Sequence, residues 1–151
     1  MPFDPVKFLQ TEVQGKMETK YPSVPAGTYR AMVDNLKGRS QKNDDGSDPT
    51  PILDIYWTID DAALKEKLGM EKISVRQSCF LDLSPEGAIL RGEGKNIALG
   101  KVREAIGQNW EDKPWAPHML KGAVASITVT NAPNPKDPES PYSNVQSVSK
   151  L

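Results

Sequence analysis

The sequence predicts a mainly β fold, a five-stranded barrel with one helix between the third and fourth strands. Two observations lead to this prediction: apolar and polar residues alternate in five separate runs, and apolar residues recur at helical spacing in one other. The strand-like runs cover residues 27–37, 52–59, 72–83, 123–130 and 142–148, and the helical run covers 95–107. This order of elements is typical of an OB-like Greek-key barrel, a fold that binds oligonucleotides or oligosaccharides.

The composition is that of a single domain with one core. The chain has 151 residues and a net charge of −1, which is unfavourable for a nucleic-acid binder unless its cations gather on one face. The single cysteine, Cys79, excludes a disulfide within the chain and favours a cytosolic protein. We expect no membrane partner, because no apolar run is long enough to span a bilayer and no signal pattern opens the sequence.

Residues 1–26 are expected to form an N-terminal arm, and residues 27–151 the OB-like domain. Prolines at positions 2, 5, 22 and 25 prevent a long helix or a central strand in the arm. Four of its apolar side chains, Phe3, Phe8, Leu9 and Val13, could pack on the barrel or on a neighbouring subunit. The sequence leaves open whether the arm is a partly ordered tail, docks on the barrel or contacts a second copy of the chain as a homo-oligomer.

Alternation assigns the faces of the first three strands. The inward positions of the first two are Tyr29, Ala31 and Val33, then Leu53, Ile55, Trp57 and Ile59. In the third run, Gln77 is a polar residue at an inward position. Between the second and third runs, residues 61–69 have an aspartate cap and a terminal glycine, which predicts a short helix.

The helical run places five apolar residues on one stripe, which should face the barrel. They are Ala98, Leu99, Val102, Ala105 and Ile106. The fourth run, GAVASITVT, and the last, YSNVQSVSKL, complete the five strands.

Two long polar loops are expected at residues 38–50 and 131–141. An OB-like barrel binds its ligand across the second and third strands, between the loops that join strands one to two and four to five. The first of these loops carries Arg39 and Lys42, which are expected to close over the bound strand. Loops of this length are uncommon unless they are functional or disordered, so tolerated surface insertions are the alternative.

Tyr56, Arg76 and Phe80 are candidate binding residues on the outward face of the second and third strands. Aromatic rings stack on bases, and a guanidinium group holds phosphate, so Arg76 is expected to hold a phosphate between two stacked bases. Alternatively, the arm or the 61–69 helix covers this face and Phe80 belongs to the core. The binding face would then lie around Arg30, Lys101 and Arg103.

No catalytic centre is apparent, and we expect neither an enzyme nor a metal or other cofactor. His118 is the only histidine, so a multi-histidine site is not available, and Cys79 has no second cysteine beside it. The acidic loop at 44–48 lacks the ligand spacing of an EF-hand calcium site.

Six segments carry a resemblance to a known group of proteins. They are FDPVKFL, VPAGTYRAMV, PILDIYWTID, VRQSCFLDL, GKNIALGKVREAIGQN and LKGAVASITVTN. In this order they resemble small early-expressed bacteriophage proteins that look like OB-type single-stranded-DNA-binding proteins, over about residues 25–150. The resemblance implies a non-catalytic, sequence-nonspecific binder of single-stranded DNA that acts in phage DNA replication or recombination, in the cytoplasm of the bacterial host. The chain departs from many such binders because it ends in SVSKL rather than in an acidic tail.

Two alternative functions remain at this point. Small β-barrels with proline-rich arms also suit assembly, so the chain is compatible with a capsid-decorating or tail protein of the virion. A phage protein that binds a host defence component is the other alternative.

Overall fold

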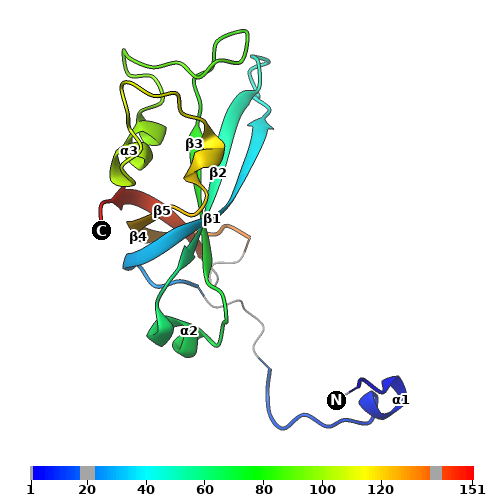
Figure 1. Cartoon of the computed structure of the whole chain (residues 1–151). Coiled ribbons are helices and arrows are strands. Elements are labelled where there is room, and N and C mark those ends of the chain that lie inside the picture. Colours follow the sequence, from blue (N-terminus) through cyan, green and yellow to red (C-terminus); the bar gives the residue numbers. More distant parts are fainter. Residues whose placement is uncertain (1, 18–22, 137–140) are drawn as a thin grey trace.

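The computed structural model describes residues 2–17, 23–136 and 141–151 (Figure 1). The strands are β1 (Gly27–Gln41), β2 (Thr50–Ile59), β3 (Ser74–Phe80), β4 (Val124–Ala132) and β5 (Tyr142–Ser149). The helices are α1 (Pro5–Phe8), α2 (Ala62–Leu68) and α3 (Ile97–Ala105), with a 3-10 turn, η1, at Pro117–Leu120. None of the helices in these ranges is long and apolar enough to cross a membrane.

The five strands form one sheet that closes on itself in the order β1-β2-β3-β5-β4. The pairs β1–β2, β2–β3, β4–β5 and β1–β4 are antiparallel, and β3 meets β5 in parallel where Arg76 pairs with Asn144. The prediction of a mainly β fold with five strands is therefore confirmed. In the chain α3 follows β3 and precedes β4, and it lies against β5 and β3 (Figure 1).

The core fills the inside of this ring. The alternation of apolar and polar residues in β2 correctly predicts which of its side chains belong to the core. The inward side chains of β2 are Leu53, Ile55, Trp57 and Ile59, all buried. Trp57 is fully buried, and its indole Nε1 donates a hydrogen bond to Gln77 Oε1 at 2.9 Å. This bond explains why a polar residue occupies an inward position of β3, because a buried indole N–H needs an acceptor.

A β-bulge in β1 changes which of its side chains face outward. The pairing with β2 shifts register between Val33 and Asn35, so Asp34 is the extra residue. Leu36 then packs against the core instead of pointing outward. Pairing continues from the bulge to Gln41, opposite Thr50. The predicted loop at 38–50 is therefore too long, since its first four residues belong to β1.

The sequence predicts α2 fully and the inward stripe of α3 only in part. The prediction of a short helix at 61–69 is confirmed: Asp61 caps α2 by accepting from Leu64 N at 3.0 Å, and Gly69 ends it at φ 66°. In α3, Leu99 and Val102 are buried as expected. Ala98 is exposed, so its predicted place on the inward stripe is wrong.

The arm is exposed over all of its described residues up to position 17. Asp4 caps α1, and Phe3 and Phe8 contact each other with ring centroids 5.3 Å apart. Pro22, one of the four prolines expected to prevent a long helix or a central strand in the arm, lies outside the described residues. The division into an arm and a barrel domain at residues 26 and 27 stays a prediction.

Candidate nucleic-acid interface

The outward side of β1, β2 and β3 presents three rows of side chains, which we call the strand face. Strand pairing sets the rows, because residues directly opposite one another share a face of the sheet. They are Asn35–Tyr56–Arg76, Lys37–Asp54–Ser78 and Arg39–Ile52–Phe80. The bulge at Asp34 places Lys37 and Arg39 of β1 on this face, since without it the alternation would turn these two side chains inward.

The first row puts an aromatic ring beside a cation. Tyr56 is half-buried and pairs directly with Arg76, which is exposed. Directly opposite residues have Cβ atoms about 5 Å apart, so the ring and the guanidinium can contact the same nucleotide. Among the described residues, no carboxylate forms a salt bridge with Arg76.

The middle row contains a buried carboxylate. Asp54 is 1% exposed, and its oxygens accept hydrogen bonds from Arg39 Nε and from Ser78 Oγ, each at 2.6 Å. Burial by itself would raise the pKa of Asp54, but these two bonds and the charges of Arg39 and Arg76 hold the pKa below its ordinary value. Asp54 is therefore ionised at neutral pH, and Arg39 balances its charge.

The position of Arg39 corrects its expected role. The prediction that it lies in the loop after the first strand is wrong, because β1 continues to Gln41. Its guanidinium is also bound to a buried partner rather than free to close over a ligand. Lys42 does lie in the loop between β1 and β2, as expected, and it is exposed.

The third row contains the most accessible aromatic ring of the strand face. Phe80 is 60% exposed, whereas its partner Ile52 is 1% exposed. The alternative in which Phe80 belongs to the core is thus wrong. Phe80 lies four residues from Arg76 along β3, about 13 Å away. Ser78 and Asp54 lie between the two aromatic rings, and Arg76 lies directly opposite Tyr56 rather than midway between the rings. The expectation that Arg76 holds a phosphate between two stacked bases stays a prediction.

The remaining candidate residues lie elsewhere. Arg30 is exposed near the start of β1, with its Nε 3.9 Å from Asp60 Oδ2. Lys101 is exposed on α3, in a groove between that helix and β5. Arg103, also on α3, lies over the ring of Trp115 at 4.4 Å. These three cations line three different hollows of the surface, so they are a weaker alternative to the strand face.

Sequence reasoning missed Lys37 and the part played by Asp54. The sequence does indicate a paired carboxylate at Asp54, because a carboxylate inside the apolar run PILDIYW requires a partner. It contains no such indication for Lys37, because the bulge that turns Lys37 outward depends on the pairing with β2.

Groups suited to other chemistry are isolated. Within the described ranges, no three histidine, cysteine, aspartate or glutamate side chains are grouped to hold a metal ion. Cys79 is fully buried, and burial together with nearby Asp54 raises its pKa to about 11. A thiol with so high a pKa is a weak nucleophile at neutral pH, because the reactive form is the thiolate.

Comparison with known proteins adds no family to this picture. No family model matches the sequence, and no curated protein matches it. The features of the chain that bear on function are therefore the ring of strands and the composition of the strand face.

Proposed function

We propose that the protein binds single-stranded DNA without sequence preference, through the strand face of an OB-like barrel. The observation that carries this proposal is the placing of Tyr56, Arg76 and exposed Phe80 on two neighbouring strands. The strand order β1-β2-β3-β5-β4 and the position of α3 between β3 and β4 support the OB-like assignment. Lys42, in the β1–β2 loop, flanks the same face.

Charge on the strand face supports this function despite the net charge of the chain. The face holds three cations, Lys37, Arg39 and Arg76, against one carboxylate, Asp54. Since Arg39 neutralises Asp54, Lys37 and Arg76 remain to attract phosphate. Local charge, rather than the total, governs the approach of a charged ligand to a surface.

Stacking accounts for the lack of sequence preference. Every base has a flat face, so one that stacks on Phe80 or Tyr56 is held without being identified. The cations contact the backbone, which is the same at every nucleotide. A duplex hides its bases, so we expect the protein to prefer single strands.

The biological setting follows from the sequence resemblance. Similarity to small phage proteins of the single-stranded-DNA-binding type supports a role in phage DNA replication or recombination, in the cytoplasm of the bacterial host. The role is non-catalytic and needs no cofactor.

The test is fluorescence anisotropy of labelled oligo-dT and of a duplex of equal length, each titrated with protein at several salt concentrations. We expect tighter binding of the single strand and an affinity that falls as salt rises, because bound phosphates release counterions. Equal binding of both ligands, or no binding at low salt with micromolar protein, would refute the proposal.

The exposed arm favours a second candidate, a structural protein of the virion. Phe3, Phe8 and Leu9 are 70%, 58% and 82% exposed, and apolar side chains gathered on an arm suit contact with another subunit. Mass spectrometry of purified phage particles separates the candidates: stoichiometric protein in the particle supports the virion role, and its absence leaves DNA binding.

A further inference from the structure

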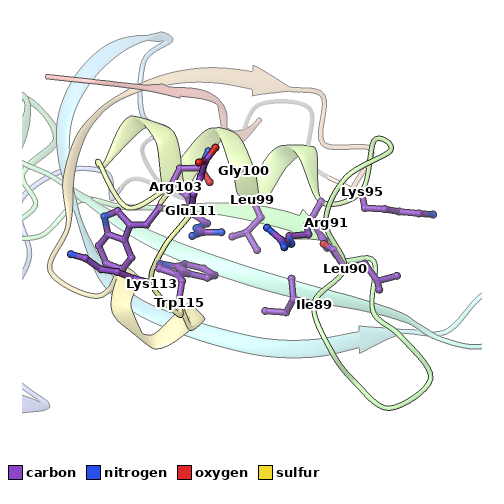
Figure 2. Close-up of a pocket in the computed structure, with 13 residues that line it drawn as sticks. Ile89, Leu90, Arg91, Lys95, Leu99, Gly100, Arg103, Glu111, Lys113 and Trp115 are labelled. Carbon is purple, nitrogen blue, oxygen red and sulfur yellow. The ribbon is translucent and has the colours of Figure 1, made fainter.

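A cavity with a volume of about 400 Å³ lies beside α3, apart from the strand face. We call it the tryptophan pocket. The residues that define its character are Arg91, Lys95, Leu99, Arg103, Trp110 and Trp115 (Figure 2). No residue of the strand face lines it. Its volume falls within the range of roughly 300–1,000 Å³ that is usual for small-molecule sites.

One wall of the pocket is a flat stack fixed by hydrogen bonds. The Arg103 guanidinium lies 4.4 Å from the centre of the Trp115 ring, and its Nε and Nη2 donate to the Gln108 carbonyl at 3.2 and 3.0 Å. Trp115 Nε1 donates to Gln108 Oε1 at 2.8 Å. Gln108 thus holds both planar groups in place, so little order is lost when a ligand binds.

The opposite wall supplies cations without carboxylate partners. Arg91 and Lys95 are exposed, and no described residue forms a salt bridge with either. Figure 2 shows Arg91 and Arg103 on either side of Leu99. Lys113, which lies 4.8 Å from the Trp110 ring, is a fourth cation of the lining, and Glu111 is the only carboxylate among the described residues that line the pocket. This excess of positive charge calls for an anionic ligand.

The turn that carries Arg91 and Lys95 is held firmly. Gly92 and Gly94 have φ of 82° and 80°, a conformation that glycine adopts without strain. Buried Asn96 follows, and its Nδ2 donates to the carbonyls of Asp82 and Leu90. The cations are therefore presented from a supported turn.

We infer that the tryptophan pocket binds a nucleotide, a phosphate joined to a flat base. A base stacks on an indole or on an arginine plane, and both surfaces are present in the Arg103–Trp115 wall. The phosphate then lies at Arg91, next to the apolar side chain of Leu99, while Lys95, whose side chain points away from the Trp115 ring (Figure 2), adds positive charge at the rim of the pocket. Inorganic phosphate alone would leave the rings unused, and a nucleoside alone would leave the cations unused. The ligand is either a free nucleotide or the phosphorylated end of a DNA strand, which have this chemistry in common.

Tryptophan fluorescence of the full chain tests the inference, with thymidine monophosphate as the probe. Trp57 is fully buried in the barrel and gives a constant background, so quenching reports Trp110 and Trp115. We expect saturable quenching by the nucleotide, and at least tenfold weaker quenching by thymidine or by inorganic phosphate. A 5′-phosphorylated oligo-dT that competes, beside an unphosphorylated one that does not, identifies a strand end as the source. Failure of both oligonucleotides to compete identifies the free nucleotide.

Exposed cations provide variants that should fold normally. Arg91→Gln is expected to weaken nucleotide binding by about tenfold to a hundredfold, the cost of one charge-assisted hydrogen bond. Lys95→Gln removes a positive charge at the rim and is expected to weaken binding by up to about fivefold. Lys121→Gln removes an exposed positive charge outside the pocket and should leave affinity unchanged. Arg76→Gln should also leave it unchanged, which separates this pocket from DNA binding by the strand face.

Three results would overturn the inference. They are absence of saturable quenching at nucleotide concentrations up to about 5 mM, equal affinity of the parent and both pocket variants, and tighter binding of an acidic peptide such as oligo-glutamate than of the nucleotide.

Discussion

Asp54 combines two roles that usually conflict, since it is a buried charge in the middle of a proposed anion-binding surface. A bare carboxylate there would repel phosphate and would lose its hydration without compensation. The hydrogen bonds from Arg39 and Ser78 satisfy the carboxylate oxygens of Asp54, and the positive charge of Arg39 offsets the negative charge of Asp54. Stability and binding on this face therefore depend on the same ion pair.

Substitution of Arg39 tests the structural side of that pair. We expect Arg39→Ala to lower the free energy of unfolding by about 1–3 kcal/mol, since it leaves a buried acceptor without its charged donor. Lys37→Ala is the matched control, because Lys37 is an exposed cation in the same strand with no described ion-pair partner, and it should change stability by less than about 0.5 kcal/mol. Urea denaturation measures both. Equal stability of the two variants would contradict the role assigned to Arg39.

The lowered pKa of Asp54 predicts an acid-sensitive contribution to stability. An aspartate in the unfolded chain has a pKa of about 3.9, and the folded protein holds Asp54 below its ordinary value. Its ionised form therefore stabilises the fold fully above the unfolded pKa, and this contribution is lost as pH falls through the folded pKa. We expect the stability difference between the parent and Asp54→Asn to shrink between neutral pH and about pH 3. Asp44→Asn, in the exposed loop, is the control, and an unchanging difference for Asp54→Asn would oppose this account.

At the scale of elements, the connection from β3 to α3 depends on one residue. Asn96 is 8% exposed, has a φ of 53°, and bonds through its side chain to both Asp82 and Leu90. It thereby closes a loop that carries one wall of the tryptophan pocket. A side-chain amide can bind backbone N–H and carbonyl groups at the same time, because it has both a donor and an acceptor. Asparagine also tolerates positive φ better than most residues.

Two substitutions separate the contributions of Asn96. We expect Asn96→Ala to cost roughly 3 kcal/mol, because it removes the side-chain partners of the half-buried Asp82 N–H and Leu90 carbonyl and strains the left-handed backbone. Asn96→Gly loses the same hydrogen bonds but accepts positive φ, so it should be about 1 kcal/mol less destabilising. Thermal denaturation gives both values. Equal stability of the alanine and glycine variants would mean that the positive φ at position 96 causes no strain in the alanine variant.

The sequence predicts some elements well because their signals are local. The faces of β2 follow from alternation alone, and the ends of α2 from Asp61 and Gly69. The bulge at Asp34 and the extension of β1 to Gln41 depend on pairing with β2, which no local pattern contains. The candidate site divides in the same way: the exposure of Phe80 could be predicted, whereas the pairing of Arg39 with Asp54 could not.

For the whole molecule, DNA affinity should depend on the exposed ring of the strand face. We expect Phe80→Ala to lose about 1–3 kcal/mol of binding to oligo-dT, the range for one stacked base. Phe8→Ala is the matched control, since Phe8 is an aromatic residue of similar exposure, 58%, in the arm. Anisotropy titrations measure affinity and thermal melts verify folding, which neither change should disturb. Equal affinity of Phe80→Ala and the parent would remove Phe80 from the interface.

The seam where the ring of strands closes has a consequence for its dynamics. β3 and β5 meet through the single described pair Arg76–Asn144, whereas the other neighbours are joined by extended antiparallel ladders. Local opening therefore costs least there, and amide hydrogens along this seam should exchange with solvent faster than those of the β1–β2 ladder. Arg76 belongs to both the seam and the strand face. A bound DNA strand that contacts Arg76 should therefore slow amide hydrogen exchange along the seam and make local opening of the barrel between β3 and β5 less frequent.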